Sequence, residues 1–580
     1  RREYPNGSIG GQVIGYCNVD GEGITGLELQ YNDILSGTPG TYTAERGEQG
    51  FPIPGGVKEE TPAVNGQDIM VSLDIKLQDT VEQALAEGVK DLETEEGSSI
   101  VMDAATGEIY AACSLPYMNP ADMSSSQVGS ESVKAITQAY EPGSTFKPVV
   151  VAAALEEGVI DDNSTFYCRG AVTIDNWTIR CSARSGHGSQ SLRKAVMNSC
   201  NPALIDIGKK LGAEKFYEYW ENFGFTSKTG IELPSEEKST FWDKELFVSP
   251  SGVTQLATAS FGQRFTTTPI HLITALSAVI NGGHLLEPYL VQSVTDAEGN
   301  VVSYHEPKEV RQVISQETSD LVRSYMESVV NDPGGTGKNA KVEGYHIGGK
   351  TGSSQTLDSK DHIIVSFLGF APADDPEVIV LLGYDWPQPA APGENTTADG
   401  IYISGGNMAA PMAGELIANI LDYLGYEKSG SDVNANGVTI PHLVGKTPEE
   451  ARTALNNLGL NVRLSGEGAV VTDQMPTAGS SVPKGSSTVL YLGEEKPETT
   501  VEMPDLSGMT YDEAKAALEK VGLYLEATGT GESGKVFSQS VNAGTVLDVG
   551  TAVEVKFTDD TAPDNGVTTG GGWAPKEEEE

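Results

Sequence analysis

The sequence predicts a protein of the α+β class, built around an antiparallel sheet that packs on helices. Two apolar runs, at 100–102 and 109–112, flank the turn Thr106-Gly107 and indicate a β-hairpin. Before the hairpin, apolar residues recur with helical spacing at Leu77, Val81, Leu85 and Val89. Two further strands are predicted at 362–370 and 377–384. We also expect a β-rich N-terminal platform and two small C-terminal modules.

The composition limits the classes of function. The chain has 580 residues, enough for three or four domains, and its hydrophobic content of 38% allows real cores. Asp and Glu number 82 against 38 Lys and Arg, for a net charge of −44. Such an excess of negative charge repels phosphate backbones, so we expect no nucleic-acid partner.

The cysteines and the ends of the chain bear on its compartment. Five cysteines, an odd and sparse count, do not indicate a disulfide framework. No apolar run reaches the roughly 18 residues that span a membrane, and no signal peptide is visible. The chain begins Arg1-Arg2 without an initiator Met, so we expect a fragment whose N-terminal part was removed.

Shifts in composition divide the chain into parts. Residues 1–66 are rich in Gly, Pro and Thr and predict an extended platform with little core of its own. Residues 67–426 contain the predicted sheet and helices and form the main domain. A linker rich in Ser, Gly, Asn and Asp follows at 427–438.

The C-terminal part contains an internal repeat. Nine residues between Pro441 and Leu460 recur 63 positions later, starting at Pro504. This self-similarity predicts two modules of one helix plus strands, at 439–493 and 501–557. Residues 558–580 end in four glutamates, and we expect an acidic, disordered tail.

The central motif is Ser144-Thr145-Phe146-Lys147, which the sequence places at the start of a helix. Pro142-Gly143 interrupt the chain just before it, and Gly158 ends the apolar run that follows. Side chains three residues apart share a helix face, so the Ser144 hydroxyl and the Lys147 amine can approach each other. A lysine kept neutral by burial could take the proton of a serine nucleophile. Four letters alone are weak evidence.

Two further motifs follow in order. Ser199-x-Asn201 falls inside a helix predicted over 192–211, and Lys350-Thr351-Gly352 falls in a predicted strand. The trio Ser-x-x-Lys, Ser-x-Asn and Lys-Thr-Gly is typical of penicillin-binding proteins and class A β-lactamases.

The chain resembles a class B penicillin-binding protein, a peptidoglycan D,D-transpeptidase of the division or sporulation type. The resemblance rests on Tyr140 to Lys147 and on further stretches, which are Ser260-Phe261-Gly262-Gln263, Thr268-Pro269, Asn281-Gly282-Gly283, Asp103 with Thr106-Gly107-Glu108-Ile109, and Phe223-Gly224-Phe225 with Thr229-Gly230-Ile231. It implies a penicillin-binding/β-lactamase-like fold for the main domain. The two repeats resemble PASTA modules, whose ligand binding stays open against a purely structural role.

The resemblance implies a role for each motif residue. Ser144 would attack the substrate carbonyl, Lys147 would act as the base, and Ser199 would pass a proton to the leaving amine. Asn201 would hydrogen-bond the substrate amide and Lys147.

The third motif would bind the substrate. Lys350 and Thr351 would hold the carboxylate of a peptide C-terminus, and Gly352 would let substrate backbone come close. The N–H groups of Ser144 and Ser353 would form the oxyanion hole.

The implied reaction is acylation of Ser144 by the D-Ala-D-Ala end of a peptidoglycan stem peptide, with loss of D-Ala and resolution by an amine. β-Lactams would trap the same serine, and the chemistry needs no cofactor. The implied partner is a SEDS-family glycan polymerase. The implied location is the extracytoplasmic face of the bacterial membrane, reached through a missing N-terminal helix.

Two other motifs compete with this interpretation. Lys228-Thr229-Gly230 is a second Lys-Thr-Gly, but it follows Ser199 by only 29 residues and no paired strands come after it. The stretch from Gly344 to Thr351 satisfies the phosphate-loop pattern. A phosphate loop leads from a strand into a helix, and no apolar helical stripe follows here.

Cys168, Cys181 and His187 form a loose metal-binding pattern, with Asp175 or Cys200 as a possible fourth ligand. A structural zinc, a Cys168–Cys181 disulfide and free buried thiols stay open as alternatives. Sporulation-type relatives resemble the chain here and some hold zinc, which favours a sporulation role. On a helix, the Cys200 side chain would point away from those of its neighbours in the second motif.

Other classes of function share these motifs. A β-lactam or muropeptide sensor, or a wall-binding protein, could use the same fold without transpeptidation. A β-lactamase needs a deacylating base, and no carboxylate can be assigned that role from the sequence.

Overall fold

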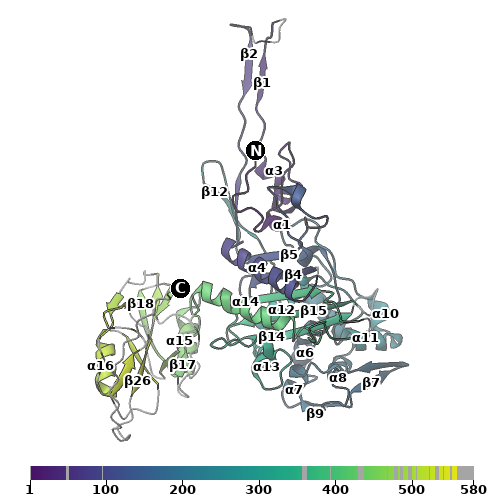
Figure 1. Cartoon of the computed structure of the whole chain (residues 1–580), viewed down its shortest axis with the longest axis vertical. Helices are drawn as coiled ribbons and strands as arrows, with labels where there is room; N and C mark the ends of the chain where they lie inside the picture. The colour runs from purple at the N-terminus through teal and green to yellow at the C-terminus, as the bar shows by residue number, and fades with distance from the viewer. Residues whose placement is uncertain are drawn as a thin grey trace, which may run out of the picture. The chain divides into compact units, whose positions relative to one another are not determined.

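A five-stranded antiparallel sheet forms the centre of residues 1–428, the larger of two compact units in the computed structural model (Figure 1). The second unit comprises residues 429–580. The structure describes residues 2–47, 51, 53–94, 96–355, 362–391, 394–426, 428, 437–466, 468–475, 481–483, 487–493, 500–504, 506–507, 509–521, 523–528, 535–539, 541, 543–548 and 552–557. The predicted acidic tail at 558–580 and most of the predicted linker lie outside the described residues.

The sheet joins segments far apart in the chain. Its strands follow one another across the sheet in the order β14 (Gly348–Gln355), β15 (Ile363–Ala371), β16 (Val378–Asp385), β4 (Glu96–Asp103) and β5 (Ile109–Leu115). Every neighbouring pair is antiparallel, and β14 lies at one edge. The hairpin predicted around Thr106-Gly107 therefore supplies the two strands at one side of the sheet, β4 and β5, and the segment with Lys350 forms the opposite edge.

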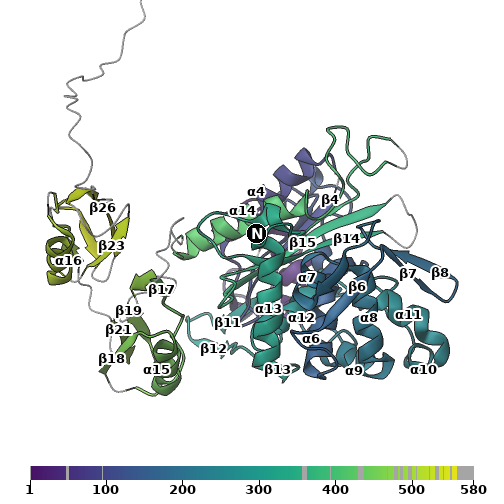
Figure 2. The same ribbon diagram turned by 90° about the horizontal axis from the view of Figure 1, so that it is seen from below.

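Helices cover both faces of the sheet (Figure 2). On one face, Val378, Val380 and Leu382 of β16 pack with α4 (Ile75–Asp91) and α14 (Ala409–Leu424). On the other, the alternate residues Ile379 and Leu381 join the core of a larger helical layer. This alternation follows the period of two of a strand, and burial of both faces explains why β16 is apolar throughout.

The helical layer surrounds one fully buried helix. All twelve residues of α12 (Pro269–Ile280) are buried. The other helices of the layer are α5 (Lys134–Thr137), α6 (Lys147–Glu156), α7 (Leu192–Met197), α8 (Asn201–Leu211), α9 (Ala213–Asn222), α10 (Lys244–Val248), α11 (Val253–Ala259) and α13 (Gln316–Asn331). Short strands join them: β6 (Thr165–Cys168), β7 (Ala171–Ile174), β8 (Trp177–Arg180), β9 (Gly188–Ser191), β10 (His284–Leu286) and β13 (Glu309–Gln312).

The helix predicted over 192–211 is wrong, because the structure breaks it into α7 and α8. Ser199 adopts a left-handed backbone with φ of +50°, and Cys200 is extended and caps α8. A left-handed residue cannot continue a right-handed helix. The apolar spacing carries on across the break, so it concealed the interruption.

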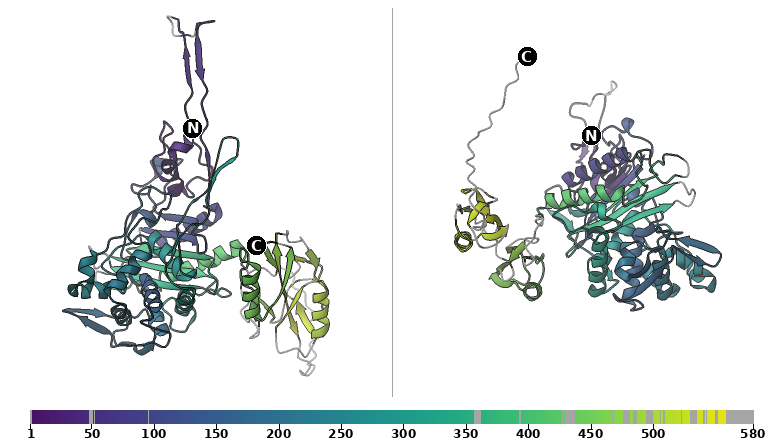
Figure 3. Two further views of the ribbon diagram at one scale, coloured as in Figure 1. Left: turned by 180° about the vertical axis from the view of Figure 1, so that it is seen from behind. Right: turned by 60° about the horizontal axis from the view of Figure 1, so that its bottom comes forward.

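The N-terminal residues form an arm on the main unit. Short helices α1 (Gly11–Ile14), α2 (Gly26–Gln30) and α3 (Asn32–Leu35) lead to the hairpin of β1 (Thr41–Ala44) and β2 (Lys58–Thr61). The hairpin projects from the domain (Figures 1 and 3). At its base, β3 (Asp68–Val71), β11 (Val291–Thr295) and β12 (Val301–Tyr304) form a small sheet.

The second unit repeats one topology. The first module contains β17 (Gly437–Thr439), α15 (Pro448–Asn457), β18 (Asn461–Gly466), β19 (Asp473–Met475), β20 (Ser481–Pro483) and β21 (Ser487–Leu492). The second contains β22 (Thr500–Glu502), α16 (Tyr511–Lys520), β23 (Tyr524–Thr528), β24 (Val536–Gln539), β25 (Val546–Asp548) and β26 (Ala552–Phe557). The repeated glutamines make the same hydrogen bonds in both modules. Gln474 and Gln539 each accept from the backbone N–H of a leucine and donate to the carbonyl of a proline.

Among the residues that the structure covers, we find no helix with both the length and the apolar character that crossing a bilayer requires.

We expect Gly262→Ala to destabilise the protein more than Gly299→Ala. Both glycines have a left-handed backbone, with φ of +82° and +84°, so alanine is strained at both by about 1 kcal/mol. At Gly262 the added carbon would also clash with the carbonyl oxygen of Gly143, whereas nothing lies within 4 Å at Gly299. The clash should cost a further ~1–3 kcal/mol. Urea unfolding of both variants checks this, and equal losses would contradict it.

Candidate active site

The turn that carries Ser144 is held firmly from several sides. Residues Gly143–Phe146 form a 3₁₀ turn that runs into α6. Gly143, at φ of +57°, donates its N–H to the carbonyl of Gly262 at 2.8 Å. The Thr145 hydroxyl donates to the carbonyl of Pro142 at 2.6 Å. Phe146 is buried, and the centroid of its ring lies 4.9 Å from the ring centroid of Phe265. The serine therefore sits on a rigid support.

Lys147 is buried at the start of α6 and lies at the centre of the site. Its Nζ donates to the carbonyl of Ser199 at 2.7 Å, to Ser199 Oγ at 3.0 Å and to Asn201 Oδ1 at 2.7 Å. Burial lowers the pKa of Lys147 to about 7, because the charged ammonium loses its hydration. Near neutral pH the amine is therefore partly unprotonated and able to accept a proton.

The second motif lies in the break between α7 and α8. The left-handed backbone of Ser199 lets both its carbonyl and its hydroxyl face Lys147. Asn201 is the first residue of α8, and its Nδ2 donates to the carbonyl of Arg180 at 3.2 Å. The break in the helix thus brings two polar groups to one amine.

The third motif lies on the edge strand β14. Lys350 is fully buried, and its Nζ donates to Ser199 Oγ at 3.0 Å and to the carbonyl of Thr351 at 3.1 Å. Burial, together with the positive charge of Lys147, holds the pKa of Lys350 well below its usual range. Ser199 Oγ therefore lies between two lysine amines, one from α6 of the helical layer and one from β14 of the sheet.

The same strand approaches the Ser144 turn closely. A side-chain carbon at Gly352 would collide with Ser366 Oγ and approach Thr145 at 3.0 Å, so only glycine fits without displacement. Ser353 Oγ donates to the carbonyl of Gly352 at 2.8 Å and accepts the N–H of Gly405 at 3.0 Å. The sequence analysis did not identify Gly405 as a residue of the site. The adjacent glycines Gly405-Gly406 were the one feature of the sequence that could have indicated a close backbone approach there.

The predicted contact between Ser144 and Lys147 is not among the hydrogen bonds of the described residues. The Lys147 amine instead points to the second motif, and the Ser144 hydroxyl has no side-chain hydrogen bond in the described part of the chain. The approach of these two groups, and the oxyanion hole formed by the N–H groups of Ser144 and Ser353, stay predictions.

Neither competing motif forms the structure it would need. Lys350 and Thr351 lie within β14, which pairs with β15, so the phosphate-loop interpretation is wrong. Lys228-Thr229-Gly230 lies outside any strand, and the N–H of Thr229 donates to Glu236 Oε1 at 2.6 Å.

The structure brings four potential metal ligands together next to the second motif. Ligand atoms of Cys168, Cys181, His187 and Cys200 all lie within 4.8 Å of one another. Cys181 Sγ is 3.6 Å from His187 Nδ1 and 4.0 Å from Cys200 Sγ. A tetrahedral zinc with Zn–S bonds near 2.3 Å requires sulfurs about 3.8 Å apart, so the spacing fits.

The cluster resolves two alternatives left open by the sequence. All five cysteines are unbridged, so the structure does not contain a Cys168–Cys181 disulfide. Asp175 accepts a hydrogen bond from Thr254 at 2.9 Å and is not part of the cluster, whose fourth member is Cys200. The hydrogen bond between the two thiols lowers the pKa of Cys181 and raises that of Cys200.

Family comparisons match two kinds of domain. The family described as "Penicillin binding protein transpeptidase domain" matches residues 97–403, and the "PASTA domain" family matches residues 438–494 and 501–559.

Curated relatives share much of the chain. It is 36% identical over 509 residues to Stage V sporulation protein D of Bacillus subtilis, an alignment that covers 85% of this chain and 76% of that protein. It is 31% identical over 440 residues to penicillin-binding protein PbpB of Mycolicibacterium smegmatis, covering 72% of this chain and 64% of the relative. It is 29% identical over 439 residues to the probable peptidoglycan D,D-transpeptidase PenA of Neisseria gonorrhoeae, with coverage of 73% and 69%.

Solved structures share the fold. Penicillin Binding Protein 2X from Streptococcus thermophilus aligns with a TM-score of 0.61 at 22% identity, over 96% of this chain and 82% of that one. Penicillin binding protein 3 from Mycobacterium tuberculosis, complexed with aztreonam, aligns with a TM-score of 0.64 at 23% identity, over 75% and 93%. These likenesses confirm the predicted α+β fold.

We expect Lys147→Met to reduce the pH dependence of the free energy of unfolding. Lysine in the unfolded chain holds its proton up to about pH 10.5, whereas the buried Lys147 amine loses it near pH 7. Unfolding therefore takes up a proton between these values, so stability rises with pH by up to about 1.4 kcal/mol per unit. Below pH 7 this slope disappears.

Methionine has a similar length and no proton to exchange, so the variant should lose the contribution of Lys147 to this slope, while the lowered pKa of Lys350 keeps a contribution of its own. Urea unfolding at pH 7, 8 and 9 measures it. Lys209→Met, on the exposed side of α8, is the control and should keep the wild-type slope. A slope unchanged in Lys147→Met would show that its amine is not desolvated.

Proposed function

The chain belongs to the penicillin-binding protein transpeptidase family and carries two PASTA domains, and from this premise we propose that it is a serine-type peptidoglycan D,D-transpeptidase. One observation carries the proposal. The Ser199 hydroxyl lies 3.0 Å from each of two buried lysine amines, next to the turn that bears Ser144. This geometry supports the transfer of a proton between a nucleophile and a leaving group.

In the proposed reaction, Ser144 Oγ bonds to the carbonyl carbon of the penultimate D-Ala of a stem peptide. The neutral amine of Lys147 takes the hydroxyl proton. When the C–N bond breaks, Ser199 passes a proton to the departing amino group of D-Ala, and its own proton is replaced from the lysines. The resulting ester is then attacked by an amine of a second peptide, which regenerates Ser144. β-Lactams would form a longer-lived ester with the same serine.

The substrate carboxylate would bind at Lys350 and Thr351. An anion beside Lys350 raises the pKa of its amine, so substrate binding itself would restore the positive charge that burial disfavours. The N–H groups of Ser144 and Ser353 would stabilise the tetrahedral oxyanion. The hydrogen bond from the N–H of Gly405 to Ser353 Oγ supports a role for the Ser353 N–H in the oxyanion hole, because it fixes the backbone of β14 at Ser353.

The Cys/His cluster would hold a structural zinc ion. Cys168, Cys181, His187 and Cys200 would be its ligands, and a closed set of four protein ligands leaves no open position for catalysis. The ion would join the segment around Cys168 and Cys181 to the start of α8. The transpeptidation chemistry needs no cofactor in this proposal.

The cellular setting follows from the family. We propose that the protein acts at the extracytoplasmic face of a bacterial membrane, together with a SEDS-family glycan polymerase. The alignment with Stage V sporulation protein D and the Cys/His cluster support a role in sporulation. The alternative of a sensing or wall-binding protein has no observation of its own in its favour.

We expect a fluorescent penicillin to form one stable adduct that Ser144→Ala abolishes. Only an activated serine should open the lactam ring, and alanine lacks the nucleophilic oxygen. Intact-mass measurement reads the adduct directly. Ser303→Ala, an exposed serine on β12, is the control and should label like the wild type. A folded wild type that forms no adduct would refute the transpeptidase proposal.

We expect one zinc ion per chain in protein purified under reducing conditions. Cys181→Ser should lose the ion and unfold at a lower temperature, because it removes one of four ligands. Cys17→Ser lies outside the cluster and should keep both metal and stability. Native mass spectrometry and thermal unfolding measure the two effects. Wild type that stays metal-free when refolded with zinc would exclude the site.

A further inference from the structure

The segment that supplies the Cys/His cluster is basic in a strongly acidic protein. The whole chain carries a net charge of −44, yet residues 165–187 contain three arginines and only one acid, Asp175. The arginines are Arg169, Arg180 and Arg184, so the local charge is +2 with His187 neutral. A positive cluster on such a background creates a local attraction for anions that the rest of the surface repels.

All three arginines are exposed. None forms an ion pair with a carboxylate among the residues that the structure describes, and Asp175 is occupied by Thr254. Arg169 lies over the ring of Tyr167, with 5.6 Å between its guanidinium carbon and the ring centroid. Their planar donor groups therefore face solvent, where they can pair with carboxylates in two parallel hydrogen bonds.

The fold of the segment groups these arginines at its surface. Cys168 and Cys181 turn their thiols inward, so the residues beside them, Arg169 and Arg180, lie outside. The N–H of Cys181 donates to the carbonyl of Gly170 at 2.9 Å, which joins the two cysteine-bearing stretches. Gly170, at φ of +87°, packs against the backbone of Arg184 so closely that a side chain would collide with it.

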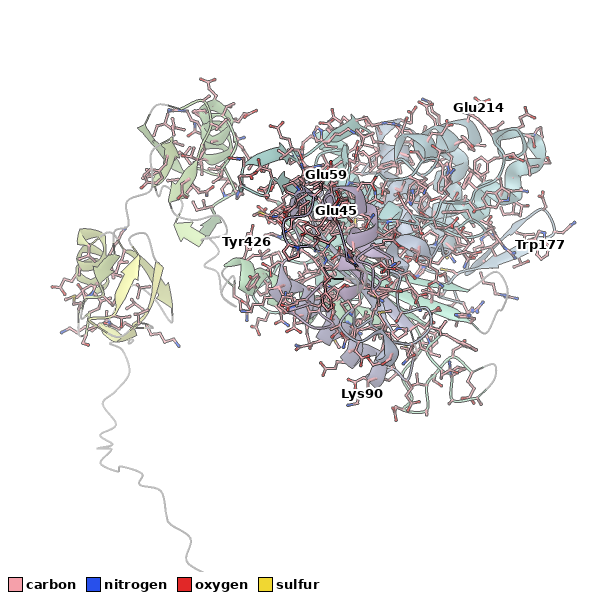
Figure 4. The ribbon with its side chains drawn as sticks, turned by 90° about the horizontal axis from the view of Figure 1, so that it is seen from above. Glu45, Glu59, Lys90, Trp177, Glu214 and Tyr426 are labelled. Carbon is pink, nitrogen blue, oxygen red and sulfur yellow. The ribbon has the colours of Figure 1, made fainter. Side chains whose placement is uncertain are left out.

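The group is connected directly to the catalytic residues. The carbonyl of Arg180 accepts from Asn201 Nδ2 at 3.2 Å, and Asn201 Oδ1 accepts from Lys147 at 2.7 Å. Arg180 ends β8, whose hairpin with β7 projects from the helical layer (Figure 2). Figure 4 shows Trp177, near the tip of that hairpin, at the outer margin of the domain, far from Lys90 on α4.

We propose that Arg169, Arg180 and Arg184 bind the carboxylates that a stem peptide carries before its D-Ala-D-Ala end. The inference rests on the proposed function, and it adds a specificity determinant outside the three motifs. A substrate with several carboxylates would be repelled by most of this acidic surface, and Arg180, one of the three arginines, contacts the catalytic Asn201 through its backbone carbonyl. They orient the peptide while Lys350 holds its C-terminus.

The experiment compares two peptides of one sequence. Both are N-acetylated and end in D-Ala-D-Ala; one has its side carboxylates free and the other has them amidated. Release of D-Ala gives kcat/KM for the wild type and for the triple variant Arg169→Ala, Arg180→Ala, Arg184→Ala. The matched control removes the same charge elsewhere, through Arg46→Ala, Lys90→Ala and Lys209→Ala, all exposed. Labelling by fluorescent penicillin is measured on every sample.

The triple variant should lose about tenfold in kcat/KM on the free-carboxylate peptide, as expected for three exposed ion pairs. It should lose less than about twofold on the amidated peptide and in penicillin labelling, and the control should match the wild type. Equal losses on both peptides, or no loss on either, would overturn the proposal while penicillin labelling stays intact. A wild type that neither labels nor releases D-Ala would refute the proposed function itself.

Discussion

The amines of Lys147 and Lys350 are both buried beside the hydroxyl of Ser199, and this contact constrains the architecture around it. Burial strips each ammonium of water, and the two repel each other when both are charged, so the arrangement is costly to hold. The surrounding fold offsets this cost with a carbonyl, an amide oxygen and a hydroxyl that accept from Lys147. An amine that is half deprotonated at neutral pH is the result, and it is the property that general-base chemistry needs.

The first two elements of the site come from the helical layer and the third from the sheet, and each lies where regular structure is interrupted or ends. The Ser144 turn is a 3₁₀ segment fixed to Gly262, the second motif lies at a broken helix, and the third lies on an edge strand. An edge strand has free backbone groups on one side, where an extended peptide can add as a further strand. The buried helix α12 and the two-faced sheet supply the rigidity against which these departures are stable.

Much of this fold could be predicted because its elements are strongly periodic. The strands β15 and β16 and the helix α4 were predicted to within two residues, since burial imposes clear apolar patterns on them. The break at Ser199 could not be predicted, because its cause is tertiary. The left-handed backbone is stabilised by contacts with Lys147 and Lys350, which lie 52 and 151 positions away. The membership of Cys200 rather than Asp175 in the Cys/His cluster depends on the same break.

The broken helix also links the Cys/His cluster to the catalytic motif. Cys200 sends its thiol to the cluster, while its neighbours Ser199 and Asn201 send their polar atoms to Lys147. A regular helix would separate these directions by about 100° per residue and leave Ser199 and Asn201 on different faces. The left-handed residue removes that separation. A metal ion at the cluster would therefore fix the backbone of the motif from behind, and the loss of the ion would loosen the residues that hold Lys147.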